Sequence, residues 1–331
     1  MLRYIKTIDA HASGETLRLV VDGFPRSRGS TIQEKQDWLR RRHDKLRRTL
    51  MHEPRGHVDM NGAVLTEPVV PGSDVGVLFM HHQGYSAMCG HGVIAVVTIA
   101  LERQLLKPTD LTAEILLDTL AGTIYAQPIW QGDQVESVSF INVPSFVLHA
   151  GVPIRIGTHE FSVDVAFGGS FYAIVDSESV GIPVHGQYLS DLRKLGMQIK
   201  EAVESVVTVA HPLDHNLRGV YGTIFTGLPN NEDADLRNVT VFSGSQVNRS
   251  PCGTGMSAVM AVIDAMGLLN RERSFVCESI IGLQFSGSLV DRTTVGEFPA
   301  IVPRITGSAW ITGEHKFIIN DSDPLGNGFR I

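Results

Sequence analysis

The sequence predicts an α/β protein made of two similar halves, each with strands around one central apolar helix. The phrase Cys-Gly-X-Gly occurs at 89–92 and again at 252–255, and the stretches 89–106 and 252–269 share further Ala, Val and Leu-Leu positions. Their offset of 163 residues (252 − 89) is close to half of the 331-residue chain. Because a chain of this length exceeds the usual single domain, we expect a duplicated domain, each copy able to bury a core.

In the first half, the alternation over 4–22 predicts strands interrupted at Ala12-Ser13-Gly14-Glu15. A helix is predicted from a cap at Ser30 or Thr31 to about Leu50. Its basic residues at 40–48 are interpreted as a solvated outer face, because acidic residues are interleaved with them. A strand over 75–83 then leads through Gly84 to the first cysteine motif and a helix to about Leu106.

Strand-like segments with short turns follow at 115–117, 123–127, 137–141, 145–149, 161–165 and 171–175. A second amphipathic helix covers about 188–202, and strands near 220–225 and 239–243 lead into Cys252 and its helix. The remainder is rich in strands, with turns expected at Gly282, Gly287, Gly307 and Gly313.

Composition excludes several classes of protein. A net charge of −7 gives no electrostatic footprint for nucleic acid, and 43% hydrophobic residues with a mean hydropathy near zero are typical of a soluble globular chain. The first residues lack the apolar core of a signal peptide, and the apolar runs are shorter than a membrane span, so we expect a cytoplasmic protein. Three cysteines are too few for a disulfide framework.

The two motif cysteines have a setting that favours chemistry. A thiol at a helix N-terminus faces unsatisfied backbone N–H groups and the positive end of the helix dipole, which lower its pKa and make it a base or a nucleophile. Glycines at 90, 92, 253 and 255 let N–H groups approach an anionic ligand. We infer an anionic substrate held at two helix starts, with its reacting carbon between two sulfurs.

Other interpretations of the cysteines remain open at this stage. Both could be buried structural residues, or could form a disulfide after oxidation, although a structural disulfide fits a cytosolic chain poorly. A cysteine hydrolase with Cys252 as nucleophile and His91 or His211 as base leaves Cys89 without a role. A non-catalytic binding module is a further alternative. Zinc has little support, because His and Cys residues at the spacing of zinc ligands are absent. No phosphate-binding or dinucleotide fingerprint occurs at either motif. Cys277 is predicted to lie in the core.

These motifs resemble a known family. Met88-Cys89-Gly90-His91-Gly92 and Arg249-Ser250-Pro251-Cys252-Gly253-Thr254-Gly255 are similar to the paired signatures of the proline racemase family. Supporting stretches are His11-Ala12-Ser13-Gly14-Glu15, Glu53-Pro54-Arg55-Gly56, Gly168-Gly169-Ser170-Phe171-Tyr172, Asp323-Pro324 and Gly328-Phe329. The resemblance implies a diaminopimelate-epimerase-like fold of two pseudo-symmetric α/β domains with the active site between them, and no cofactor. It implies domains at 1–127 plus about 315–331, where the last strand crosses back, and at 128–314.

The resemblance also implies roles for individual residues. Cys89 and Cys252 would be the two acid/base thiols, one removing the α proton of the substrate while the other delivers a proton to the opposite face. Gly90, His91, Gly253 and Thr254 would hold the substrate, and preorganised donors would stabilise the developing enediolate. The implied partner is a small molecule, proline or a hydroxyproline, with no metal, nucleic acid or membrane. A homodimer is one alternative for the oligomeric state.

The subfamily is less clearly defined by the motifs. Two thiols favour a racemase or epimerase, because a dehydratase needs only one α-proton base; we therefore rank this activity first. Dehydration of trans-3-hydroxy-L-proline is second, and dual activity is a further alternative, because four segments look like the dehydratase branch found in animals: 56–60, 84–86, 163–164 and 221–223. Asn248, a further candidate substrate-binding residue, replaces the Asp that the family usually has near the substrate amine. Gly222 replaces a His common in 4-hydroxyproline epimerases.

Overall fold

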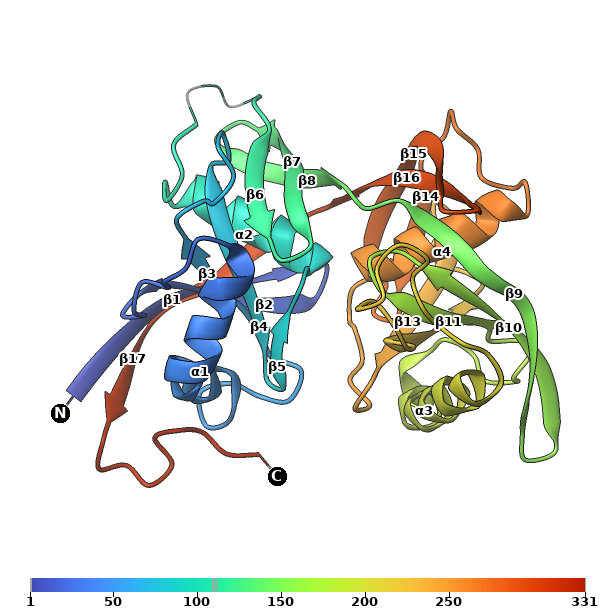
Figure 1. Cartoon of the computed structure of the whole chain (residues 1–331), viewed down its shortest axis with the longest axis horizontal. Helices are drawn as coiled ribbons and strands as arrows, with labels where there is room; N and C mark the ends of the chain where they lie inside the picture. The colour runs from blue at the N-terminus through green and yellow to red at the C-terminus, as the bar shows by residue number, and fades with distance from the viewer. Residues whose placement is uncertain (1, 109, 111, 331) are drawn as a thin grey trace. The chain divides into compact units, whose positions relative to one another are not determined.

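The computed structural model describes residues 2–108, 110 and 112–330, and the chain divides into two compact units. Unit 1 contains Met1–Phe140 and Ser308–Ile331, and unit 2 contains Ile141–Gly307 (Figure 1). The sequence placed these boundaries at 127/128 and 314/315. Strand pairing explains the difference, because β8 (Gln134–Ile141) stays on β7 (Gly122–Gln131), and β17 (Ala309–Asn320) lies along β1 (Leu2–Ala12) from Ala309 onward.

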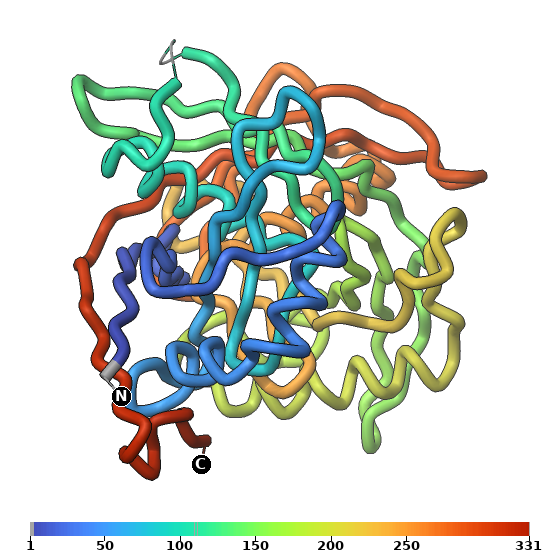
Figure 2. Tube along the Cα trace, turned by 60° about the vertical axis from the view of Figure 1, so that its left-hand side comes forward, coloured from blue at the N-terminus to red at the C-terminus, as the bar shows by residue number. Residues whose placement is uncertain are grey.

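Unit 1 is a mixed sheet around a helix. Its further elements are β2 (Glu15–Asp22), α1 (Ile32–Met51), β3 (Asn61–Thr66), β4 (Val75–His81), β5 (Gly84–Ser86), α2 (Gly90–Glu102) and β6 (Ile115–Thr119). The strand order is β17-β1-β2-β3-β4-β6-β7-β8, parallel at β2/β3 and β4/β6 and antiparallel elsewhere. The N-terminal strand and β17 run side by side (Figure 2), which brings the end of the chain back to unit 1.

Unit 2 is built from β9 (Ser145–Ile156), β10 (His159–Phe167), β11 (Phe171–Asp176), α3 (Leu189–Val206), β12 (Gly222–Gly227), β13 (Leu236–Phe242), α4 (Gly253–Ala265), β14 (Phe275–Ser279), β15 (Gln284–Val295) and β16 (Phe298–Gly307). A short 3-10 helix, Gly186–Tyr188, precedes α3. The strand order is β10-β11-β12-β13-β14-β15-β16-β9, parallel at β11/β12 and β13/β14. Because β9 also pairs with β10, this sheet closes on itself.

The two sheets repeat one pattern, which confirms the duplication. The series β1-β2-β3-β4-β6-β7-β8 matches β10-β11-β12-β13-β14-β15-β16, with parallel pairs at the same two places. Side chains repeat as well. Asp118 accepts hydrogen bonds from the backbone N–H groups of Val69 and Val70, and Glu278 accepts them from those of Asn230 and Asn231.

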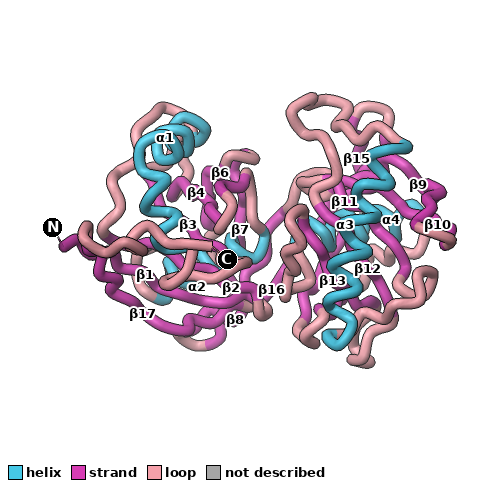
Figure 3. Tube along the Cα trace, turned by 90° about the horizontal axis from the view of Figure 1, so that it is seen from below, coloured by secondary structure: helices cyan, strands magenta, loops and turns pink. Residues whose placement is uncertain are grey.

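The central helices α2 and α4 are buried by the strands of their own units (Figure 3). Every α2 residue from Gly90 to Leu101 is buried, as is most of α4 up to Val262. Both helices end alike: Leu105 N–H bonds the Ala100 carbonyl and Leu268 N–H bonds the Ile263 carbonyl, after left-handed Gln104 (φ 55°) and Gly267 (φ 74°). This motif ends α2 at Glu102, earlier than the predicted Leu106.

Helix α1 begins as predicted but differs from its predicted outer face. The Thr31 hydroxyl accepts a bond from Glu34 N–H, and the Glu34 carboxylate accepts bonds from the N–H and hydroxyl of Ser30. Placing all the basic residues at 40–48 on a solvated face was wrong for Arg47. Its side chain is buried and donates to the His81 and His82 carbonyls while pairing with Asp44, so it fixes the end of β4.

Two glycines predicted as turns lie inside strands. A Cβ at Gly287 would lie 2.4 Å from Met260 Sδ, so β15 approaches α4 closely there. Gly313 lies in β17 opposite Asp9, beside a bulge in the β1–β17 pairing. Gly282 does turn the chain between β14 and β15, with φ 87°. Within the described part of the chain, no helix is both long and apolar enough to cross a bilayer.

Candidate active site

Cys89 occupies the N-cap of α2 in unit 1. Its carbonyl accepts the first helical bond from Val93 N–H, and its half-buried thiol sulfur lies 3.4 Å from each ring nitrogen of His91. A Cβ at Gly92 would lie 2.7 Å from Phe79 Cε1 and 2.9 Å from the Cys89 sulfur. The second glycine of the motif is therefore required by the close packing of thiol, helix and strand β4.

His91 is held as a neutral imidazole. Burial lowers its pKa to about 4, although a hydrogen bond to the backbone of Thr16 in β2 acts in the opposite direction. A neutral ring offers one donor and one acceptor, and the bond to Thr16 fixes its orientation. His91 therefore contributes hydrogen bonding beside the Cys89 thiol without adding a positive charge at neutral pH.

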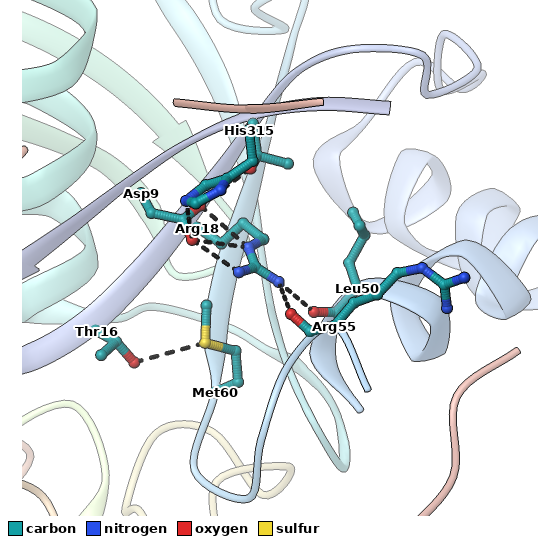
Figure 4. Close-up of polar contacts among 8 residues, drawn as sticks. Asp9, Thr16, Arg18, Leu50, Arg55, Met60 and His315 are labelled. Carbon is teal, nitrogen blue, oxygen red and sulfur yellow. Dashed lines mark hydrogen bonds and ion pairs between the residues drawn. The ribbon is translucent and has the colours of Figure 1, made fainter. Parts of the chain in front are cut away.

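The segment Gly56–Met60 lies next to this strand. The Thr16 hydroxyl contacts Met60 Sδ at 3.8 Å, and the Asn61 amide donates to the Glu15 carboxylate at 2.9 Å. Figure 4 shows how the segment is anchored: buried Arg18 pairs with Asp9 at 2.7 Å and donates to the carbonyls of Leu50 and Arg55. The part of unit 1 that looks like the dehydratase branch is thus close to the strand that holds His91.

Cys252 occupies the N-cap of α4 in unit 2, and it is more enclosed than Cys89. It is 4% exposed and has φ 64°, a left-handed conformation that a residue with a side chain adopts at a cost. The Tyr172 hydroxyl lies 2.7 Å from Thr254 Oγ1 and 3.9 Å from the Cys252 sulfur. The sequence alone did not place Tyr172 at the site, although Tyr172 ends the stretch 168–172, one of those that supported the family resemblance.

The pKa of Cys252 differs from the expectation for a helix start. Burial raises the pKa of this thiol, and hydrogen bonding from the Gly255 N–H and from the hydroxyls of Thr254, Tyr172 and Thr240 only partly offsets it. The prediction of a lowered pKa was therefore wrong for Cys252, because desolvation outweighs the helix terminus. Burial also raises the pKa of Tyr172 far above its usual range, so its hydroxyl stays protonated.

Two residues fix the loops around α4. The Asn142 amide donates to the Gly168 carbonyl and to the Ser257 hydroxyl, each at 2.8 Å. Asn248, which is buried, accepts bonds on its side-chain oxygen from the N–H and the hydroxyl of Ser250, each at 2.8 Å. The oxygen of Asn248 is thus used to shape the loop that leads to Cys252.

The two cysteine environments are related by the repeat. The β1/β2 turn ends at the pair Ala12–Glu15, and the β10/β11 turn ends at Phe167–Phe171. In unit 1 the next residue, Thr16 in β2, hydrogen-bonds His91, the second residue after Cys89. In unit 2 the next residue, Tyr172 in β11, hydrogen-bonds Thr254, the second residue after Cys252. Equivalent strand positions therefore fix equivalent helix positions, although the residues differ.

The remaining candidates lie outside this arrangement. Cys277 is fully buried, as predicted, and burial raises the pKa of its thiol. His211 packs on Phe146 and Phe167, and no hydrogen bond within the described residues joins it to Cys252. None of the three cysteines is in a disulfide. Across residues 2–108, 110 and 112–330, no group of three or more His, Cys, Asp or Glu side chains could hold a metal ion.

The fold and the two motifs define a duplicated α/β protein with one thiol at the start of each central helix. The chain belongs to the proline racemase family, whose model matches residues 7–330. It is 46% identical to the trans-3-hydroxy-L-proline dehydratase of Bacillus cereus, over 98% of this chain and 97% of that protein. It is 39% identical to the proline racemase of Clostridioides difficile, over 99% and 98%.

A solved structure agrees with this membership. A hydroxyproline epimerase from Agrobacterium vitis, crystallised with bound trans-4-OH-L-proline, is 31% identical and superposes with a TM-score of 0.89 over 99% of this chain and 95% of that one. The predicted fold class is confirmed by this match.

Proposed function

We propose that this protein is a cofactor-independent racemase or epimerase that inverts the α carbon of proline or a hydroxyproline, with Cys89 and Cys252 as its two acid/base groups. The observation that carries the proposal is the repeat: both units have a cysteine at the N-cap of the buried central helix. A reaction that used only one thiol would give no reason for a second cysteine at the equivalent helix start of the other unit. A cytoplasmic location is part of the proposal, since it fits three reduced thiols.

The proposed reaction is a pair of proton transfers. A thiolate takes the α proton from one face of the substrate, and a thiol delivers a proton to the other face; in the reverse direction the two cysteines exchange roles. Atoms balance without an oxidant, a reductant or a metal. Because burial raises the pKa of Cys252, this residue is the better candidate for the protonated partner in the unliganded protein.

The substrate carboxylate would be held at the helix starts. The first helical hydrogen bonds are donated by Val93 and Met256 to the cysteine carbonyls. The N–H groups before them, which include those of Gly90, His91, Gly253 and Thr254, are at helix starts and could therefore donate to a carboxylate. Such donors also stabilise the negative charge that develops on the carboxylate as the α proton leaves. Asn248 would contribute through its amide nitrogen, because its oxygen already bonds Ser250.

A specific observation favours a second candidate, trans-3-hydroxy-L-proline dehydratase. Two relatives of that name are 46% identical to this chain, whereas two others of that name and a relative named proline racemase are 39% identical. In this reaction one thiolate removes the α proton, and the other group protonates the 3-hydroxyl, which leaves as water and gives a pyrroline carboxylate. A protonated Cys252 could serve as that acid.

One NMR experiment in deuterium oxide separates the candidates. The purified protein, without added cofactor, is incubated with L-proline and with 3- and 4-hydroxyprolines. We expect loss of the α-proton signal and formation of the opposite configuration with at least one of them. A pyrroline carboxylate formed from trans-3-hydroxy-L-proline, with no exchange in the other substrates, would establish the dehydratase instead. No reaction with any substrate would exclude both.

A further inference from the structure

Unit 2 contains a cavity that the proposed cysteine chemistry does not use. It has a volume of about 570 Å³, within the range of small-molecule sites, and lies where β11 and β12 end and β13 begins. Its lining includes the apolar Val184 and Leu228 and two side chains of opposite charge, Glu178 and Arg237. None of the described residues that line it belongs to either cysteine motif.

Arg237 is the unusual member of this lining. It is 5% exposed, and its guanidinium makes one hydrogen bond with the described residues, from Nη2 to the Ile280 carbonyl at 2.8 Å. Its Nε has no partner there, and no described carboxylate pairs with it. Its register partner in β14, Glu278, accepts the N–H groups of Asn230 and Asn231 on one carboxylate oxygen, Oε2. A buried charge in this condition is costly unless an anion compensates it.

The repeat shows that the fold itself does not need this arginine. Arg237 pairs with Glu278 in β13/β14 as Gly76 pairs with Asp118 in β4/β6, and the two carboxylates cap equivalent backbone groups. At Gly76 a Cβ would already lie 2.7 Å from Thr66 Cγ2 and 3.1 Å from Ile32 Cδ1. The equivalent space in unit 1 is therefore filled by protein, whereas unit 2 has a buried cation beside an open cavity.

We propose that this cavity binds a small organic anion, whose carboxylate or phosphate group is held by Arg237 and whose hydrocarbon part packs on Ile182, Val184 and Leu228. The planar guanidinium can bond either a carboxylate or a phosphate through two N–H groups. The cavity is larger than a free inorganic anion requires, and its apolar lining would accommodate a hydrocarbon group attached to the anion. The site is separate from the racemase site and does not depend on its chemistry.

Binding is tested with inorganic phosphate and benzoate, followed by the backbone amide NMR signals of Gly227, Leu228 and Asn230. These signals report on the cavity, so an anion at the cysteine motifs is observed separately. We expect saturable shifts with both probes and tighter binding of benzoate, because only benzoate can use the apolar lining. Absence of saturable shifts in the native protein overturns the proposal.

Two kinds of variant locate the anion. Arg237→Met should abolish the shifts. Because that change alters a buried residue, a second test uses an exposed one. Leu228 is exposed and follows Gly227, the strand partner of Arg237, so its substitution should not affect folding. Relative to a neutral Leu228→Asn control, Leu228→Asp should weaken binding roughly threefold and Leu228→Lys should tighten it roughly threefold at low salt. Equal affinities in all three Leu228 variants would overturn the proposal, and α-proton exchange should be unchanged in each.

Discussion

At the residue scale, Cys252 and its neighbours show how several small effects set the state of one thiol. Burial raises its pKa, while hydroxyl and N–H donors lower it by smaller amounts. The position of the thiol at a helix start was predictable, because the Cys-Gly-X-Gly motif that indicates it is a short continuous segment of sequence. It could not predict the hydroxyl of Tyr172, because that contact depends on the β10/β11 turn lying against α4.

Tyr172→Phe should make catalysis by Cys252 slower. The hydroxyl of Tyr172 lowers the pKa of the Cys252 thiol, so its removal raises that pKa further and shifts the corresponding limb of the pH–rate profile to higher pH. We expect racemisation at neutral pH to fall roughly tenfold, about the value of one hydrogen bond. Rates measured across pH, with exposed Tyr125→Phe as the control, test this. An unchanged profile would remove Tyr172 from the site.

His91 should make the protein less stable in acid. Its pKa is about 4 in the folded protein and 6.5 when unfolded, so between these values only the unfolded state binds the proton. The unfolding free energy therefore falls as pH drops through this window, by about 3 kcal/mol in total from His91. Denaturant unfolding of the native protein and of His91→Gln should show a shallower pH dependence in the variant.

The exposed His159→Gln serves as the control for that experiment, since its ring is not buried. His81 and His82, whose pKa values burial also lowers to about 4, would keep part of the slope in both variants. An identical slope in the native protein and in His91→Gln would contradict a buried neutral imidazole.

At the element scale, the turn between β10 and β11 positions the start of α4. A Cβ at Gly168 would lie 2.1 Å from the Thr254 carbonyl oxygen and 2.6 Å from the Ala258 nitrogen, both backbone atoms of the helix. The strands and helices were predictable from periodicity, but this contact was not, because it joins segments far apart in the sequence. Arg47 was mispredicted for the same reason: the carbonyls that bury it belong to β4 and the following turn.

Gly168→Ala should displace the first turn of α4. We expect a loss of stability of about 2 kcal/mol or more, since backbone cannot yield as a flexible side chain does, and a loss of at least about tenfold in racemisation. Gly186→Ala, where nothing lies within 4 Å of the added Cβ, is the matched control. Calorimetry and activity measured on both variants test the prediction; wild-type behaviour of Gly168→Ala would show that the turn does not position the helix.

At the scale of the whole molecule, the repeat is the property that joins fold and function. It was visible in the sequence as the 163-residue offset and appears in the structure as matching strand orders, carboxylate caps and helix ends. The unit boundaries were harder to predict, because β8 and β17 belong to unit 1 through strand pairing and not through composition. Duplication gives each unit one thiol at the start of its central helix, and the proposed inversion of one carbon would use both.

The paired-thiol mechanism is tested by measuring racemisation in Cys89→Ser and Cys252→Ser, with α-proton exchange in deuterium oxide monitored from each enantiomer of the best substrate. Serine preserves size but is a far weaker base and acid for this step at neutral pH. We predict that each variant folds like the native protein and loses interconversion in both directions. Full two-way activity in either variant would contradict the paired-thiol mechanism.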